Sequence, residues 1–202
     1  MKKLSTRDFV TLSLLVALLI VSGYWNIPTP SGLSIVWSMV PVAIAAIAMG
    51  PLGGALLGGA FGLMSFLQCF SILGVSKMGI DLLGVGVSPL LLFVQRFIPR
   101  LLDGVLIGVL YRALRKRLPV SASCSVTGFA AAFLNTLFFM SALVLLFGNT
   151  QYLIDKMAGR AFAAYVVASV GVNGVVEIVV STLLTGAIGT ALVKADLIRD
   201  HE

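Results

Sequence analysis

Long apolar segments alternate with short polar ones along the whole chain. Six segments are apolar enough to predict membrane-crossing helices, because about twenty apolar residues span the hydrocarbon core of a bilayer. They cover residues 9–23, 36–49, 52–72, 90–111, 122–147 and 162–193. The second is short, so we expect it to be tilted or to lie where the bilayer is thinner. This pattern predicts an all-α membrane protein, a six-helix bundle forming a single domain over residues 1–202.

Glycine and proline residues refine the predicted helices. Gly50-Pro51 predicts a tight turn between the second and third segments. Small residues then recur at intervals of four, which places them on one helical face. Gly50 at the turn begins such a series, which continues with Gly54, Gly58 and Gly62 in the third segment, and the fourth segment has Gly104 and Gly108. In lipid such faces allow close helix packing. Pro99 permits either one long kinked helix or a helix that begins there.

Composition and charge agree with a membrane protein. Hydrophobic residues make up 59% of the chain and charged residues 11%, and the mean hydropathy is +1.08. Soluble proteins carry about 25% charged residues. The net charge of +6 comes from basic residues at the ends of apolar segments. They are not interleaved with aromatic residues on a polar face, so nucleic-acid binding is not expected.

The distribution of basic residues predicts the orientation in the membrane. The chain ends and the RALRKR stretch at 112–117 would share one side of a six-helix protein. The positive-inside rule makes that side cytoplasmic, so we expect a multi-pass protein of the cell membrane with both termini inside. Three connections, 24–35, 73–89 and 148–161, are then expected to be loops on the outer side.

Several kinds of chemistry have no support in the sequence. It contains no Walker A motif, and its one histidine, His201, stands next to the last residue. No nucleophile with a base and an orienting group is evident. We therefore expect no catalytic residue, metal site or cofactor. Cys69 and Cys124 lie in different segments and are interpreted as small apolar packing residues.

Charged residues inside apolar segments are costly and therefore candidates for a functional site. Arg96 and Arg100 share one face of the fourth segment, and Asp103 lies near that face. One interpretation is an Arg–Asp pair with side chains that reach the outer headgroups. The other is that an arginine binds a substrate carboxylate through its two-pronged guanidinium. Arg96 is the stronger candidate, because Asp103 is expected to engage Arg100.

Further polar residues are expected at a similar depth in the outer half of the bundle. They are Gln68, Gln95, Asn135, Asn173 and Glu177. Together with Arg96 they predict a small substrate pocket that opens outward, covered by loops such as 24–35. Tyr24 belongs to that loop, and Trp25 or Trp37 could provide an aromatic wall. Amide groups also join helices in membranes, so a purely structural role stays open for each.

The order of these features resembles a known family. An outer loop runs into IPTPSGLSIVWSMVPVAIAAIAMGPLGGALLGGAFGLMSF, followed by IPRLLDGVLIGVLYR, FLNTLFFMSALVLLFG and VNGVVEIVVSTLL. This arrangement resembles the substrate-binding (S) components of energy-coupling factor (ECF) vitamin transporters, over nearly the whole chain. The resemblance implies a six-helix protein that binds a vitamin at its outer side and is not itself an enzyme.

The resemblance also implies partners. S components dock on a transmembrane coupling (T) subunit that carries two ATPases, through a small-x-x-x-small motif on the first helix. Ser13 and Ala17 occupy that motif here, with serine in place of the usual alanine. The chain is most similar to the branch that contains the pantothenate, folate and cobalamin components. Pantothenate is the first choice, because its single carboxylate suits Arg96 and its hydroxyl and amide groups suit Asn135, Asn173 and Gln68.

Alternative functions remain at this point. Folate, cobalamin or another micronutrient could replace pantothenate. A self-sufficient secondary transporter driven by protons is a different class, and it would make Glu177 the coupling acid. Glu177 could equally donate a hydrogen bond or pair with an arginine. Against a secondary transporter, the sequence has no evident inverted repeat and no pair of interrupted helices.

Overall fold

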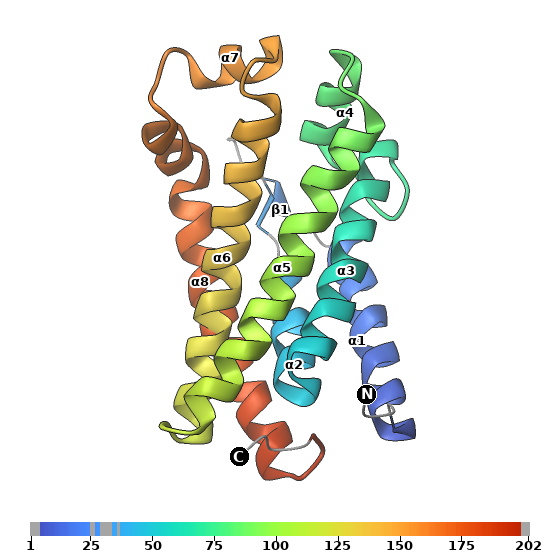
Figure 1. Ribbon diagram of the computed structural model, residues 1–202, viewed down its shortest axis with the longest axis vertical. Helices are drawn as coiled ribbons and strands as arrows, with labels where there is room; N and C mark the ends of the chain where they lie inside the picture. The colour runs from blue at the N-terminus through green and yellow to red at the C-terminus, as the bar shows by residue number, and fades with distance from the viewer. Residues whose placement is uncertain (1–4, 25–26, 29–33, 36, 199–202) are drawn as a thin grey trace.

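Long helices form an elongated bundle in the computed structural model, which describes residues 5–24, 27–28, 34–35 and 37–198 (Figure 1). The long helices are α1 (Thr6–Tyr24), α2 (Met39–Met49), α3 (Pro51–Leu67), α5 (Pro89–Arg115), α6 (Val120–Phe147) and α8 (Phe162–Lys194). The shorter elements are η1 (Gln68–Phe70), α4 (Lys77–Gly84), α7 (Gln151–Met157), and the paired strands β1 (Ile27–Pro28) and β2 (Ser34–Ile35).

Each apolar segment predicted from the sequence overlaps one of the long helices. Within the described residues, four helical stretches are long and apolar enough to cross a membrane: Thr6–Tyr24, Pro51–Phe70, Val120–Phe147 and Gly174–Lys194. Met39–Met49 is a shorter apolar helix. The remaining long helix, α5, carries the arginines and the aspartate discussed above.

Two details of the predicted architecture are corrected, and one open alternative is decided. The connections 73–89 and 148–161, expected to be loops, contain the helices α4 and α7. Their local signals are N-caps, because the Ser76 and Thr150 hydroxyls accept backbone N–H groups of the first turn. The sixth predicted segment is interrupted, because Gly171 in α8 has non-helical backbone angles. At Pro99 the first of the two possibilities holds, since α5 continues through it as one helix.

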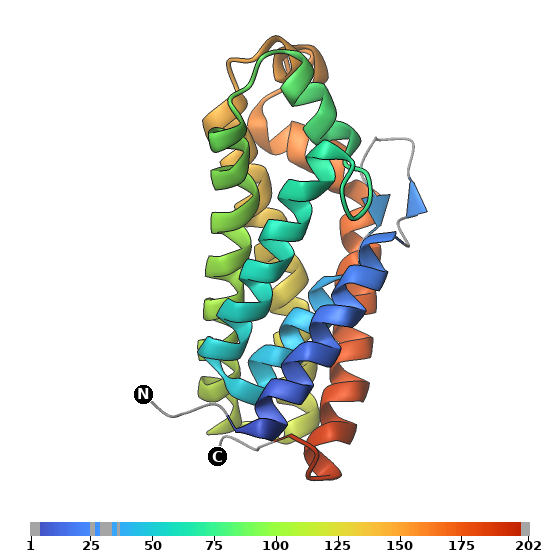
Figure 2. The same cartoon turned by 90° about the vertical axis from the view of Figure 1, so that its right-hand side faces the viewer.

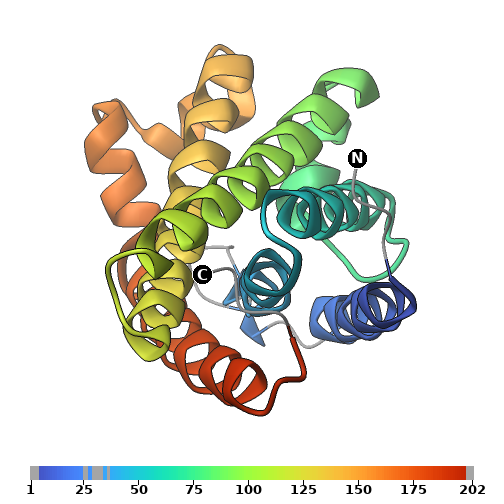
Figure 3. The same ribbon diagram turned by 60° about the horizontal axis from the view of Figure 1, so that its bottom comes forward.

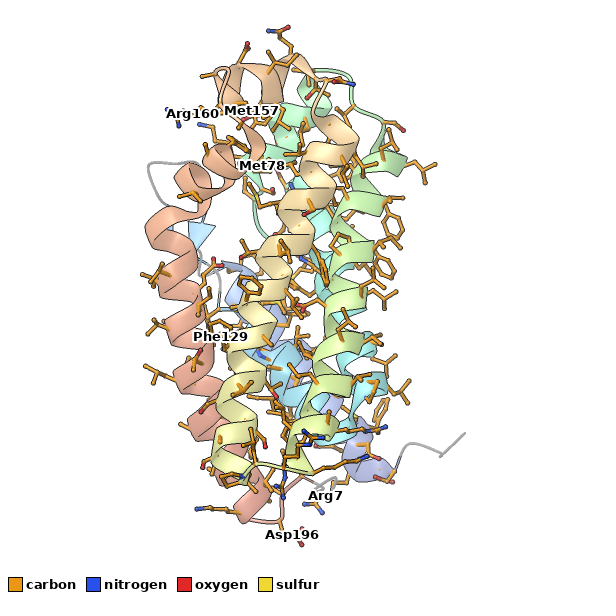
Figure 4. All side chains as sticks on the ribbon, turned by 60° about the vertical axis from the view of Figure 1, so that its left-hand side comes forward. Arg7, Met78, Phe129, Met157, Arg160 and Asp196 are labelled. Carbon is orange, nitrogen blue, oxygen red and sulfur yellow. The ribbon has the colours of Figure 1, made fainter. Side chains whose placement is uncertain are left out.

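The first residues of α1 and the last residues of α8 lie together at one end of the bundle, which we call the terminal end. There Arg7 donates hydrogen bonds to the backbone carbonyls of Asp196 and Leu197 (Figure 4). Helices α4 and α7 lie at the opposite end, which we call the capped end (Figure 2). Met78, Met157 and Arg160 mark that end in Figure 4.

Burial in this bundle is reversed relative to a soluble protein. Along the middle of α5, between Leu90 and Val109, the exposed side chains are apolar, for example Ile98 at 40% and Leu102 at 50% exposure. The opposite face buries Arg96, Arg100 and Asp103. Soluble proteins almost never bury such residues without a partner while they expose a stripe of leucines. The distribution fits a bundle surrounded by lipid, and this protein is a membrane protein.

The glycine face of α3 packs closely on a neighbouring helix, as the sequence predicts, and the structure shows that this neighbour is α5 (Figure 3). A Cβ atom added at Gly54 would collide with the Gly104 carbonyl oxygen, and one added at Gly62 would lie 2.7 Å from the Phe97 Cα. One added at Gly108 would lie 2.6 Å from the Pro51 Cα. No side chain fits between these backbones, so glycine is required sterically at this contact.

The apolar core consists of two separate clusters. One fills the terminal half and includes Leu57 and Ile107. The other lies toward the capped end and includes Leu92 and Leu143. Along α5 the stretch between these clusters is polar rather than apolar, and this is where the candidate site lies.

Candidate functional site

Polar side chains lie between the two apolar clusters on three neighbouring helical segments. Along α3 and η1 they lie between Met64 of the terminal cluster and Cys69 of the capped cluster. Along α6 they lie between Ala131 and Met140. We call this set the polar layer: Ser65, Gln68, Gln95, Arg96, Arg100, Asp103 and Asn135. Of these residues, Gln68, Gln95, Arg96 and Asn135 belong to the predicted substrate pocket, and their common depth in the membrane stays a prediction.

Arg96 connects several elements around the polar layer. Its side chain is 4% exposed. Its Nη2 donates to the Ser76 hydroxyl at 3.2 Å, and its Nη1 makes a weaker contact with the Ser65 hydroxyl at 3.5 Å. Its guanidinium carbon lies 5.0 Å from the centre of the Phe139 ring. Side chains from α3, α6 and the N-terminus of α4 therefore hold this guanidinium in place.

Arg100 lies one turn further along α5 and shares an aromatic ring with Arg96. Its guanidinium carbon is 4.8 Å from the centre of the Phe139 ring and 4.4 Å from that of Phe61. Its Nη1 donates to the Arg96 carbonyl oxygen at 2.9 Å. The Nε atoms of both arginines are buried and make no hydrogen bond with any described residue. Aromatic rings position both guanidinium groups, serine hydroxyls hold Arg96 and one backbone carbonyl holds Arg100, while the two Nε donors make no hydrogen bond with a described residue.

Asp103 was expected to engage Arg100, and it interacts with Arg100 without a hydrogen bond. Asp103 is 0% exposed, and neither carboxylate oxygen accepts a hydrogen bond from a described residue. Its interaction with Arg100 is electrostatic only, and Glu177 on α8 interacts with Arg100 in the same way. The expectation that the arginines reach the headgroups is also wrong, because Arg100 is only 6% exposed.

The other predicted site residues are less closely associated with the arginines. Gln68 donates to the Leu73 carbonyl oxygen at 3.2 Å, so its amide braces the connection to α4. Gln95 is fully buried and its amide makes no hydrogen bond with any described residue. Asn135 is half-buried, and its Oδ1 accepts no hydrogen bond within the described part of the chain.

The remaining predictions fall on peripheral or undescribed positions. Tyr24 ends α1 and is 64% exposed, and Trp37 is half-buried just before α2. Asn173 belongs to α8, two residues after the irregular Gly171, and its side chain lies outside the described part. Trp25 and most of the 24–35 loop are also outside the described residues, so the predicted loop cover is not tested.

Sequence reasoning missed several side chains around the arginines, Ser65 among them. Phe61 and Phe139 contact the guanidinium groups, and Ser76 accepts a hydrogen bond from Arg96. Tyr152 on α7 is close enough to Arg96 to interact electrostatically. Burial raises the pKa of the Tyr152 phenol, Asp81 and Tyr165 add to the rise, and Arg96 partly offsets it. Among these side chains, only Ser76 had a local signal in the sequence, because it occupies the N-cap position of α4.

The chemistry of the polar layer suits an anion. Two guanidinium groups lie in an apolar surrounding, where an electrostatic attraction is much stronger than in water. Arginine binds carboxylate and phosphate groups through paired N–H donors. The arginines already stack on Phe139, which orients them before a ligand arrives.

Comparisons with known proteins show the family of this chain and a similar fold. The family model described as "ECF transporter, substrate-specific component" matches residues 7–189. A curated relative from Lactococcus lactis subsp. cremoris, the pantothenic acid transporter PanT, is 28% identical and covers 96% of this chain and 98% of its own length. The solved structure of ThiT from Listeria monocytogenes has a TM-score of 0.60 at 14% identity, covering 93% of each chain.

Proposed function

This chain belongs to the family of ECF transporter substrate-specific components, and we propose that it binds pantothenate for uptake into the cell. Members of this family are transport subunits rather than enzymes. The vitamin is suggested by the relative that is named a pantothenic acid transporter, over nearly the full length of both chains. Folate and cobalamin have no comparable support here.

The arginine pair is the observation that carries the proposal. Pantothenate has one carboxylate, and the polar layer offers it two guanidinium groups with unused donors. The molecule also has an amide and two hydroxyl groups, which need hydrogen-bonding partners away from the carboxylate. The unpaired Asn135 Oδ1 on α6 is one such acceptor. Glu177 then acts as a counter-charge for Arg100 instead of a proton carrier.

The proposal extends to the partners and to orientation. The vitamin would enter from the capped end, and a T subunit with two ATPases would supply the energy for transport. The terminal end would face the cytoplasm, because it carries the basic cluster around Arg115 and Arg117. Reporter fusions at each end of the chain check this orientation, and an external reporter signal at either end would contradict it.

The test is ligand binding to the purified protein in detergent. A thermal-shift panel of pantothenate, folate, riboflavin, biotin, thiamine and cobalamin identifies the vitamin, and calorimetry measures its affinity. We expect stabilisation by pantothenate. Arg96→Ala should weaken pantothenate binding about 10- to 100-fold, because a hydrogen bond to a charged group contributes roughly 1.5–3 kcal/mol.

Arg112→Ala is the matched control. Arg112 is an exposed arginine on the same helix, next to the turn at Gly50 at the terminal end. It should leave pantothenate affinity unchanged. Equal losses in the two variants would contradict the assignment of the arginine pair, and stabilisation by a different vitamin would contradict pantothenate.

A further inference from the structure

Asp103 is a carboxyl group in the middle of α5 with no hydrogen-bond donor among the described residues. It is 0% exposed, and both of its oxygens are unpaired. Burial of a polar group without a hydrogen bond is costly, and more so for a carboxyl group inside a membrane bundle. The described chain does not supply the hydrogen-bond donor that would offset this cost, so the donor is expected to come from a bound molecule.

Stabilisation of Arg100 does not account for this geometry. A buried ion pair offsets its desolvation only when hydrogen bonds satisfy both groups. The Arg100 guanidinium instead lies over Phe61, and its Nη1 donates to the Arg96 carbonyl oxygen. The Asp103 oxygens therefore stay available to a donor that comes from elsewhere.

The position of Asp103 along α5 indicates which kind of molecule carries that donor. It lies three residues from Arg100 and seven from Arg96, which corresponds to about 4.5 Å and 10 Å along a helix axis. All three side chains are buried on one face of α5. Beyond Asp103 the next buried residue of that face toward the terminal end is Ile107, in the apolar cluster. An elongated molecule of about 10 Å whose carboxylate meets Arg96 would bring its other end to Asp103.

Resting on the proposed function, we infer that Asp103 accepts hydrogen bonds from donor groups at the end of the substrate opposite its carboxylate. The site is then bipolar, with guanidinium donors at one end and a carboxylate acceptor at the other. It selects molecules that carry an acid at one end and hydroxyl or amide N–H groups at the other. A carboxylic acid of the same length without donors would leave Asp103 unpaired and would bind weakly.

The experiment compares two ligands and two variants by calorimetry in detergent. The ligands are pantothenate and N-(3,3-dimethylbutanoyl)-β-alanine, which keeps the carboxylate and the amide but lacks both hydroxyl groups. The variants are Asp103→Leu, which removes the acceptor at similar size, and Asp103→Asn, which keeps one uncharged acceptor. Asp155→Asn, at an exposed position on α7, is the control.

We expect Asp103→Leu to lower pantothenate affinity about 10- to 100-fold and to change the affinity of the dihydroxy-free analogue less than about threefold. Asp103→Asn should fall between wild type and Asp103→Leu for pantothenate. The control should match wild type for both ligands. Equal losses for both ligands would overturn the inference, because Asp103 would then act through Arg100.

A second readout needs no ligand and separates the two proposals. An unpaired acceptor does not stabilise the empty protein, so Asp103→Leu and Asp103→Asn should melt at or above the wild-type temperature. If Asp103 and Arg100 formed a structural ion pair, both variants would melt at a lower temperature than the wild type. That result would overturn the inference. A wild-type protein that does not bind pantothenate would contradict the proposed function, and the melting temperatures would still decide the role of Asp103.

Discussion

At the scale of single residues, the two buried arginines depend on one aromatic ring. Phe139 lies 5.0 Å from the Arg96 guanidinium carbon and 4.8 Å from that of Arg100. The sequence predicts a buried anion site from the spacing of the arginines. It does not predict Phe139 as their common neighbour, because phenylalanine is ordinary in an apolar segment and its contact comes from another helix.

We expect Phe139→Leu to weaken pantothenate binding about 2- to 30-fold, because a cation–π contact contributes roughly 0.5–2 kcal/mol. Leucine fills similar space but has no π face to orient the two cations. Calorimetry on the purified protein measures the effect. The control is Phe129→Leu on the same helix, since Phe129 is 47% exposed on the outer surface of the bundle (Figure 4). Indistinguishable affinities of the two variants would argue against the ring as an orienting group.

At the scale of elements, the contact between α3 and α5 positions the arginine pair. The same backbone approach that brings Gly54 to Gly104 also brings Gly58 to the Arg100 carbonyl. Small residues at intervals of four predict such a contact in a membrane protein. Both α3 and α5 carry small residues at intervals of four. The sequence nevertheless did not identify α5 as the partner of α3, because α6 and α8 also contain glycines.

We expect Gly54→Ala to destabilise the protein by about 1–3 kcal/mol, since the added methyl group collides with the Gly104 backbone. Gly59→Ala in the same helix is the control, because its Cβ would meet Leu101 and Phe97 at an ordinary 3.6 Å. Thermal unfolding in detergent compares them. Equal melting temperatures of the two variants would show that α3 and α5 can separate without cost.

At the scale of the whole molecule, α1 is one of the two candidate membrane spans least buried within the described chain, together with the Gly174–Lys194 stretch of α8. It packs against α2 and α3, and its span is 22% buried within the chain. Ser13 and Ala17 lie on its exposed face. This arrangement supports the proposal that a T subunit packs there, because small residues let a second backbone approach closely.

We expect Ala17→Trp to leave pantothenate affinity of the isolated protein unchanged while it lowers copurification of a T subunit and two ATPases severalfold, together with uptake. The bulky ring prevents close helix approach, and it replaces an exposed side chain that lines neither apolar cluster. Ala187→Trp is the control, an exposed alanine on α8. Loss of pantothenate binding in Ala17→Trp, or equal assembly defects in both variants, would contradict an assembly role for this face.

The sequence by itself determined the helical segments, the close-packing glycine face and the membrane class. These properties follow from local composition and from helical periodicity, which hold wherever the segment packs. The family resemblance also followed from the sequence, because the order of its motifs survives at low identity.

Only the tertiary structure decided the composition of the site. Arg96 meets Ser76 and Phe139, which lie 20 and 43 positions away and on other helices. Asp103 was expected to pair with Arg100, yet Phe61 and the Arg96 carbonyl hold that guanidinium instead. A side chain takes the orientation that satisfies all its neighbours at once, and most of those neighbours are distant in sequence.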